Sequence, residues 1–159
     1  MRRRLLLGLA AGAVGTIALD VASYLDMLVR ARPASSTPAE VAGPLAERTG
    51  VELASAGSWS EQAGNRRSAL GALLGYGVGL GIGAAYGLAR PWLGGLPRPA
   101  AAVGLGLAAM AASDVPATAL GVTDPRTWGA AGWASDLVPH LAYGLAAATA
   151  YEALADRAG

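Results

Sequence analysis

The residues in this sequence best suited to chemistry are two aspartates and the only histidine. Asp20, Asp114 and His140 each lie within a long, mainly apolar stretch. An aspartate near the centre of a membrane helix costs about 2.5–3.5 kcal/mol, so its presence there indicates function by default. Two carboxylates beside one imidazole can relay protons, bind a cation or hold a divalent metal.

Four apolar stretches carry these residues, at 5–29, 69–89, 100–120 and 134–154. A helix over each stretch is long enough to cross the ~30 Å hydrocarbon core of a bilayer. Counted along the helices, Asp20, Asp114 and His140 share one layer, ~9–14 Å below the face opposite the N-terminus. Tyr76, on the second stretch, falls in the same layer.

The last stretch contains two further polar residues in register with its histidine. Asp136, His140 and Tyr143 recur at i, i+4 and i+7, which places them on one helix face. The layer therefore has two interpretations: a functional site, or a buried hydrogen-bonded group that only sets helix register. Asp136 has its own alternative as the N-cap of the last helix. We expect Asp26 to pair with Arg30, one turn further along.

The amino-acid composition indicates a membrane environment. Of 159 residues, 53% are hydrophobic and only 14% are charged, against about 25% in soluble domains. We therefore expect an all-α polytopic membrane protein, a four-transmembrane-helix bundle that forms one domain over residues 1–159. The absence of cysteine excludes disulfides and thiol chemistry, and the net charge of +1 gives no reason to expect nucleic acid as a partner. We expect no cofactor, since no nucleotide or metalloprotease motif is present.

Glycine recurs at every fourth position of the second apolar stretch. Small residues at this spacing let membrane helices approach closely, because lipid supplies no hydrophobic drive for association. The first stretch repeats the pattern. We expect helix packing at Gly71, Gly75, Gly79, Gly83 and Gly87, and at Gly8 and Gly12.

The long connection at residues 30–68 predicts a surface loop with a short amphipathic helix at about 38–49. Thr37 is its expected cap, with Pro38 in the first turn and Glu40 completing a capping box. The basic N-terminus continues into a long apolar run, which favours a retained helix over a cleaved signal. Arginines divide six to six between the two sides, and the first helix then favours cytoplasmic termini in a bacterial inner membrane.

The stretches "ALDVASYLDMLVRARPASSTPAE" and "VPHLAYGLAAATAYE" resemble uncharacterised small membrane proteins of actinobacteria. More distantly, a Gly/Ala-rich first helix, a long first loop and a late His-x-x-Tyr-Gly helix are similar to YagU-like inner-membrane proteins. Neither resemblance implies a reaction, so neither assigns catalytic residues.

Three function classes remain open, and the sequence favours the first. The first is a structural or accessory bundle that assembles with a second copy or another membrane protein through its glycines. The second is a small proton- or cation-linked transporter or channel that uses the Asp/Asp/His layer. The third is a lipid-modifying enzyme, for which no nucleophile or metal motif is present, so we expect no enzyme activity.

Overall fold

The computed structural model describes residues 1–51, 53 and 61–157, and within them every regular element is helical. The elements are α1 (Arg2–Arg30), α2 (Thr37–Thr49), α3 (Glu61–Ala89), α4 (Arg98–Ala119), a short 3₁₀ helix η1 (Pro125–Thr127) and α5 (Ala130–Arg157). The predicted all-α class is therefore confirmed.

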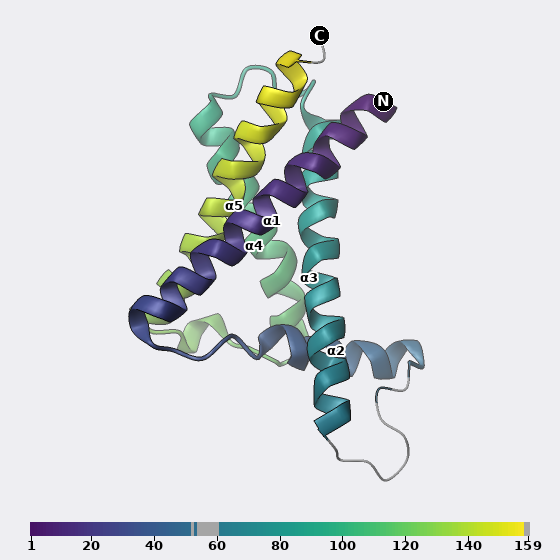
Figure 1. Ribbon diagram of the computed structural model, residues 1–159, viewed down its shortest axis with the longest axis vertical. Coiled ribbons are helices and arrows are strands. Elements are labelled where there is room, and N and C mark those ends of the chain that lie inside the picture. The colour runs from purple at the N-terminus through teal and green to yellow at the C-terminus, as the bar shows by residue number, and fades with distance from the viewer. Residues whose placement is uncertain (52, 54–60, 158–159) are drawn as a thin grey trace.

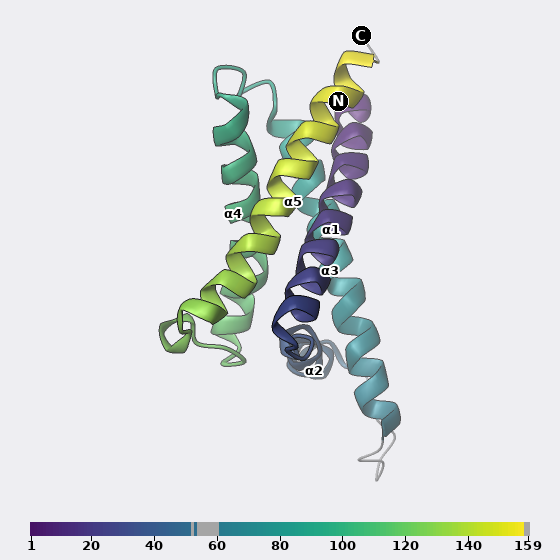
Figure 2. The same cartoon turned by 60° about the vertical axis from the view of Figure 1, so that its left-hand side comes forward.

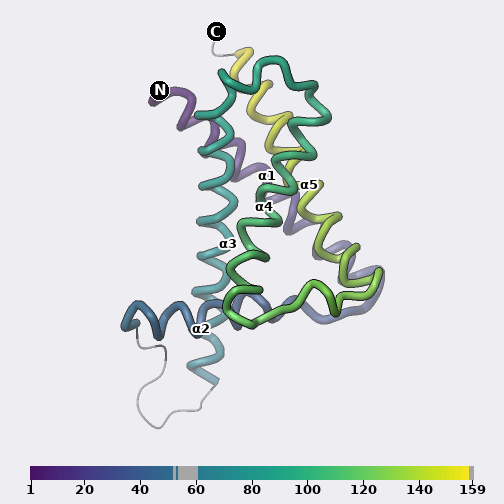
Figure 3. The backbone as a smooth tube through the Cα atoms, turned by 180° about the vertical axis from the view of Figure 1, so that it is seen from behind, coloured from purple at the N-terminus to yellow at the C-terminus, as the bar shows by residue number. Residues whose placement is uncertain are grey.

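The four long helices run the length of the molecule, and α2 lies across α3 near one end (Figure 1). Both termini lie at the opposite end. α1 packs against α3 and α5, and α5 also packs against α4 (Figure 2). Seen from behind, α4 runs between α3 and α5 (Figure 3).

Three of these helices, α1, α3 and α4, are long and apolar enough to cross a membrane. α5 has 28 residues, a similar length to the others, but Pro139, His140 and Glu152 lower its apolar character. Length and composition thus support a membrane protein with three candidate spans.

All four long helices begin earlier than their apolar stretches, and the difference is largest for α3 and α5. α3 starts at Glu61 rather than at 69, because polar residues such as Gln62, Arg66 and Arg67 are good helix formers and extend it. α5 starts at Ala130 rather than at 134. α2 coincides with the expected short helix, although Ser36 and not Thr37 occupies its N-cap, and Gly50 ends it at φ 72°.

α1 and α3 touch backbone to backbone. A Cβ atom placed on Gly83 would lie 2.5 Å from both the Cα of Gly12 and the carbonyl oxygen of Gly8. A Cβ on Gly12 would lie 3.1 Å from the Cα of Leu80. A Cβ on Gly87 would lie 2.9 Å from the Cα of Gly8. The two helices reach this separation only because these positions carry no side chain.

The remaining glycines of the α3 series differ in whether another helix packs against them. Gly71 receives the start of α2, since a Cβ there would lie 2.5 Å from the carbonyl oxygen of Pro38. Gly75 has open space around it, which differs from the expectation that it packs. It lies one turn from Gly71, which meets α2, and one turn from Gly79, which meets α1, and neither neighbour reaches it.

We expect Gly83→Ala to destabilise the protein by about 1–3 kcal/mol, the usual cost of overpacking, because the new methyl group would meet α1 backbone. Gly81→Ala is the matched control, since Gly81 lies two residues away on the same helix with open space around it. Thermal unfolding in detergent measures both. Equal melting temperatures for the two variants would show that α1 and α3 do not touch at Gly83.

Candidate functional site

Two glycines bring α4 and α5 together next to the histidine. A Cβ on Gly106 of α4 would lie 2.6 Å from the carbonyl oxygen of His140, and one on Gly144 of α5 would lie 2.5 Å from the Gly106 nitrogen. Ser113 is two turns from Gly106 and lies on the same face of α4. This close approach places the side chains of α4 within reach of His140.

His140 is held on both ring nitrogens. Nδ1 lies 2.8 Å from the backbone oxygen of Asp136, and Nε2 lies 3.4 Å from Ser113 Oγ. The imidazole is largely buried, with 12% of the side chain exposed. A carbonyl oxygen only accepts hydrogen bonds, so Nδ1 carries a proton, and Nε2 is the nitrogen at which the ring gains or loses one.

Asp136 and Asp114 complete the cluster. Asp136 Oδ1 lies 3.4 Å from His140 Nδ1. Asp136 Oδ2 is buried and has no hydrogen-bond partner among the described residues. Asp114, on α4, is close enough to Asp136 and His140 to interact with both electrostatically. The N-cap interpretation of Asp136 is wrong, because α5 begins at Ala130 and Asp136 lies in its second turn.

Two residues of the expected layer stand apart. Asp20 is half-buried on α1, and in the part of the chain that the structure describes no hydrogen bond or ion pair joins it to Asp114 or His140. Tyr76 is 50% exposed on α3. The position of a residue along a helix does not determine the direction in which its side chain points. For this reason Asp20 and Tyr76 do not join the other residues of the predicted layer.

Tyr143 serves the fold and does not join the cluster. Its ring is 1% exposed, and its hydroxyl donates to the carbonyl oxygen of Gly79 over 2.6 Å. Tyr151, two turns later on α5, donates in the same way to the carbonyl of Gly87 over 3.2 Å. The ring of Tyr143 also fills the space beside Gly15, where a Cβ would lie 2.7 Å from it. The tyrosines thus fasten α5 to the backbone of α3.

A separate charged network closes the same end of the bundle. Arg30 binds both carboxylate oxygens of Asp26 at 2.6 Å, which confirms the expected pair. Arg32 reaches the same carboxylate at 2.5 Å, and Ser135 of α5 donates to it over 3.2 Å. Arg30 also contacts Ser135. This network ties the end of α1 to the start of α5.

Sequence reasoning did not identify Ser113, Ser135 or Tyr151 as members of these groups. Ser113 directly precedes Asp114, and Tyr151 follows Tyr143 at the same two-turn spacing that separates Gly79 from Gly87. Those two signals were available in the sequence. Ser135 had no comparable signal, since its role depends on how α1 ends.

The described residues contain no group of three or more His, Asp or Glu side chains placed to hold a metal ion. Comparison of the chain with protein-family models, with curated proteins and with solved structures found no match. The site is thus interpreted from its own geometry.

We expect Tyr143→Phe to lower the free energy of unfolding by about 0.5–1.5 kcal/mol, the usual net value of one hydrogen bond, because the bond to Gly79 is lost while the ring remains. Tyr76→Phe is the control, since Tyr76 is half-exposed on the helix that accepts the bond. Thermal unfolding in detergent measures the difference. A Tyr143→Phe protein as stable as Tyr76→Phe would contradict the fastening role.

Proposed function

We propose that this protein is a four-helix membrane bundle that holds an exchangeable proton at Asp114, Asp136 and His140, and that it acts as a small proton-linked transporter or channel. The observation that carries the proposal is the buried Oδ2 of Asp136, which has no hydrogen-bond partner among the described residues. A buried charged oxygen without a partner is costly, and a proton on it removes that cost.

The surroundings of that oxygen support a proton that moves. Asp114 and His140 both interact with Asp136, so a proton can be shared between the two carboxyl groups with the imidazole beside them. Nδ1 of His140 is committed to a backbone carbonyl, which leaves Nε2 for exchange. Ser113 Oγ lies 3.4 Å from Nε2 and can accept a hydrogen bond from it when that nitrogen carries a proton.

The fourth span is α5. It lies alongside α1 and α4 for most of its length (Figure 2). With 28 residues it extends ~42 Å, which exceeds the ~30 Å hydrocarbon core. Two of its polar side chains face inward, since Tyr143 and Tyr151 are buried. An inward polar face is how membrane helices carry such residues.

The accessory-bundle alternative has less support. Most of its predicted assembly surface, including Gly8, Gly12, Gly79, Gly83 and Gly87, is filled by neighbouring helices of the same chain. A second copy would have to use Gly75, Gly77 and Gly81, which have open space around them. A stripe of small residues alone does not identify a partner.

The chain has no cysteine, so single cysteines can report the topology directly. We expect Ala34→Cys and Thr127→Cys to react with a membrane-impermeant maleimide from one side. Gly94→Cys and Asp156→Cys should react only from the other side, because α5 separates Thr127 from Asp156. Cells and inverted vesicles provide the two sides. Thr127 and Asp156 labelled from the same side would remove α5 from the membrane.

We expect Asp114→Asn and Asp136→Asn each to lower proton flux by about tenfold or more in vesicles that enclose a pH-sensitive dye, since general proton transfer by a positioned side chain contributes roughly that much or more. Asp20→Asn is the matched control, because it makes the same change in the membrane layer outside the cluster. The flux is measured after an acid pulse.

Infrared difference spectroscopy provides a readout that does not depend on flux. The wild type should show a protonated carboxyl signal at neutral pH that is lost in Asp136→Asn or Asp114→Asn and kept in Asp20→Asn. Flux that is unchanged in both cluster variants, or lost only in Asp20→Asn, would overturn the proposal.

A further inference from the structure

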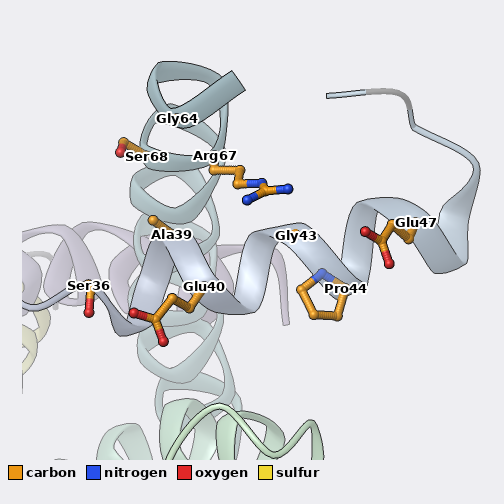
Figure 4. A pocket seen from close by; sticks show the side chains of 9 residues that line it. All are labelled: Ser36, Ala39, Glu40, Gly43, Pro44, Glu47, Gly64, Arg67 and Ser68. Atoms are coloured by element: carbon orange, nitrogen blue, oxygen red, sulfur yellow. The ribbon is translucent and has the colours of Figure 1, made fainter. Parts of the chain in front are cut away.

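A groove of about 370 Å³ lies between α2 and the first turns of α3 (Figure 4). Its volume falls within the range of small-ligand pockets, roughly 300–1,000 Å³. Each of the two helices supplies one face of the groove. The lining residues are Ser36, Ala39, Glu40, Gly43, Pro44 and Glu47 of the α2 segment, and Gly64, Arg67 and Ser68 of α3.

The groove lies at the level of lipid headgroups. Along α3 the residues change from polar at 61–68 to apolar from Ala69 onward. The α3 side of the groove, Gly64 to Ser68, ends at this boundary and extends ~6 Å from it on the polar side. α2 lies across α3, and so along the membrane plane if α3 crosses the membrane (Figure 1). The groove therefore opens where the headgroups of the bilayer lie.

The groove carries charges of both signs. Arg67 extends over α2 at Gly43, where a Cβ would lie 3.6 Å from Nε of the guanidinium (Figure 4). Glu40 and Glu47 line the groove along α2 to either side of Gly43. Within the described residues, the ion pairs of this protein do not include these three side chains. Ser36 and Ser68 add two hydroxyl groups.

We propose that this groove binds the phosphoethanolamine headgroup of a bilayer lipid. Arg67 holds the phosphate, for which the guanidinium fork is well suited. Glu40 at one end of the groove, or Glu47 at the other, accepts a hydrogen bond from the ammonium group. A purely anionic headgroup such as phosphoglycerol meets the two carboxylates and is disfavoured. A choline headgroup has no N–H group to donate, so it satisfies only the phosphate half of the groove.

The experiment measures lipid binding to the full chain by native mass spectrometry, with phosphatidylethanolamine, phosphatidylglycerol and phosphatidylcholine of the same acyl chains. The wild type should prefer phosphatidylethanolamine. Arg67→Gln should weaken its binding by about tenfold or more, the value of a charge-assisted hydrogen bond. Arg126→Gln is the control, because Arg126 is exposed outside the groove, with 92% of its side chain accessible. Equal binding by Arg67→Gln and Arg126→Gln would overturn the proposal.

A second variant tests the ammonium half. Glu40→Gln combined with Glu47→Gln should erase most of the preference for phosphatidylethanolamine over phosphatidylglycerol, and circular dichroism checks that the helices remain. A wild type that binds phosphatidylglycerol as tightly as phosphatidylethanolamine would contradict the assignment. Soluble phosphoethanolamine is added as a competitor. Weak competition supports a lipid, whereas binding as tight as that of the lipid would assign the groove to a free compound and overturn the lipid proposal.

Discussion

The contact between the backbones of α1 and α3 is the constraint on which the rest of the structure depends. Inside a bilayer, helices gain nothing from hiding apolar side chains from each other, because lipid is equally apolar. Their association must come from close packing, and Gly8, Gly12 and Gly83 permit it by leaving no side chain between the helices. This crossing lies toward the end that carries the termini (Figure 1). α1 and α3 consequently diverge toward the other end, and other elements must fill the space between them.

α5 and α2 meet that requirement by different means. α5 reaches the backbone of α3 through the hydroxyls of Tyr143 and Tyr151, which have the same two-turn spacing as their acceptors Gly79 and Gly87. A tyrosine suits this role, since its ring fills the volume that a missing side chain leaves and its hydroxyl finds a partner. α2 instead rests its first turn on Gly71. One series of glycines on α3 therefore positions three other helices, and this arrangement brings α4 and its Asp114 against α5.

The long helices could be predicted from the sequence, because hydrophobic length depends only on local geometry. The directions of the side chains could not. Asp20, Asp114 and His140 were predicted to share a depth, yet only the last two interact, because which faces of α1 and α4 turn inward is decided by packing. The same holds for Gly75, which has the spacing of its neighbours but falls between α2 and α1. Asp136 was misread as a cap because α5 extends four residues beyond its apolar stretch, and apolar length does not fix where a helix begins.

The two ends of the bundle use their charges differently. At the end with the termini, Arg90 of the α3–α4 connection binds Glu152 of α5 at 2.6 Å, and this pair sits beside the edge-to-face contact of Tyr86 with Tyr151. The hydrogen bond to Glu152 raises the pKa of Arg90, so the guanidinium stays charged. At the other end, Asp26 is satisfied by two arginines, but Asp136 keeps a buried oxygen without a partner among the described residues. The glycine contacts and the tyrosine hydrogen bonds already fasten the bundle, and neither involves that oxygen. The proposed proton-linked function would give this oxygen a role, because a proton on it removes the cost of burying a charge without a partner.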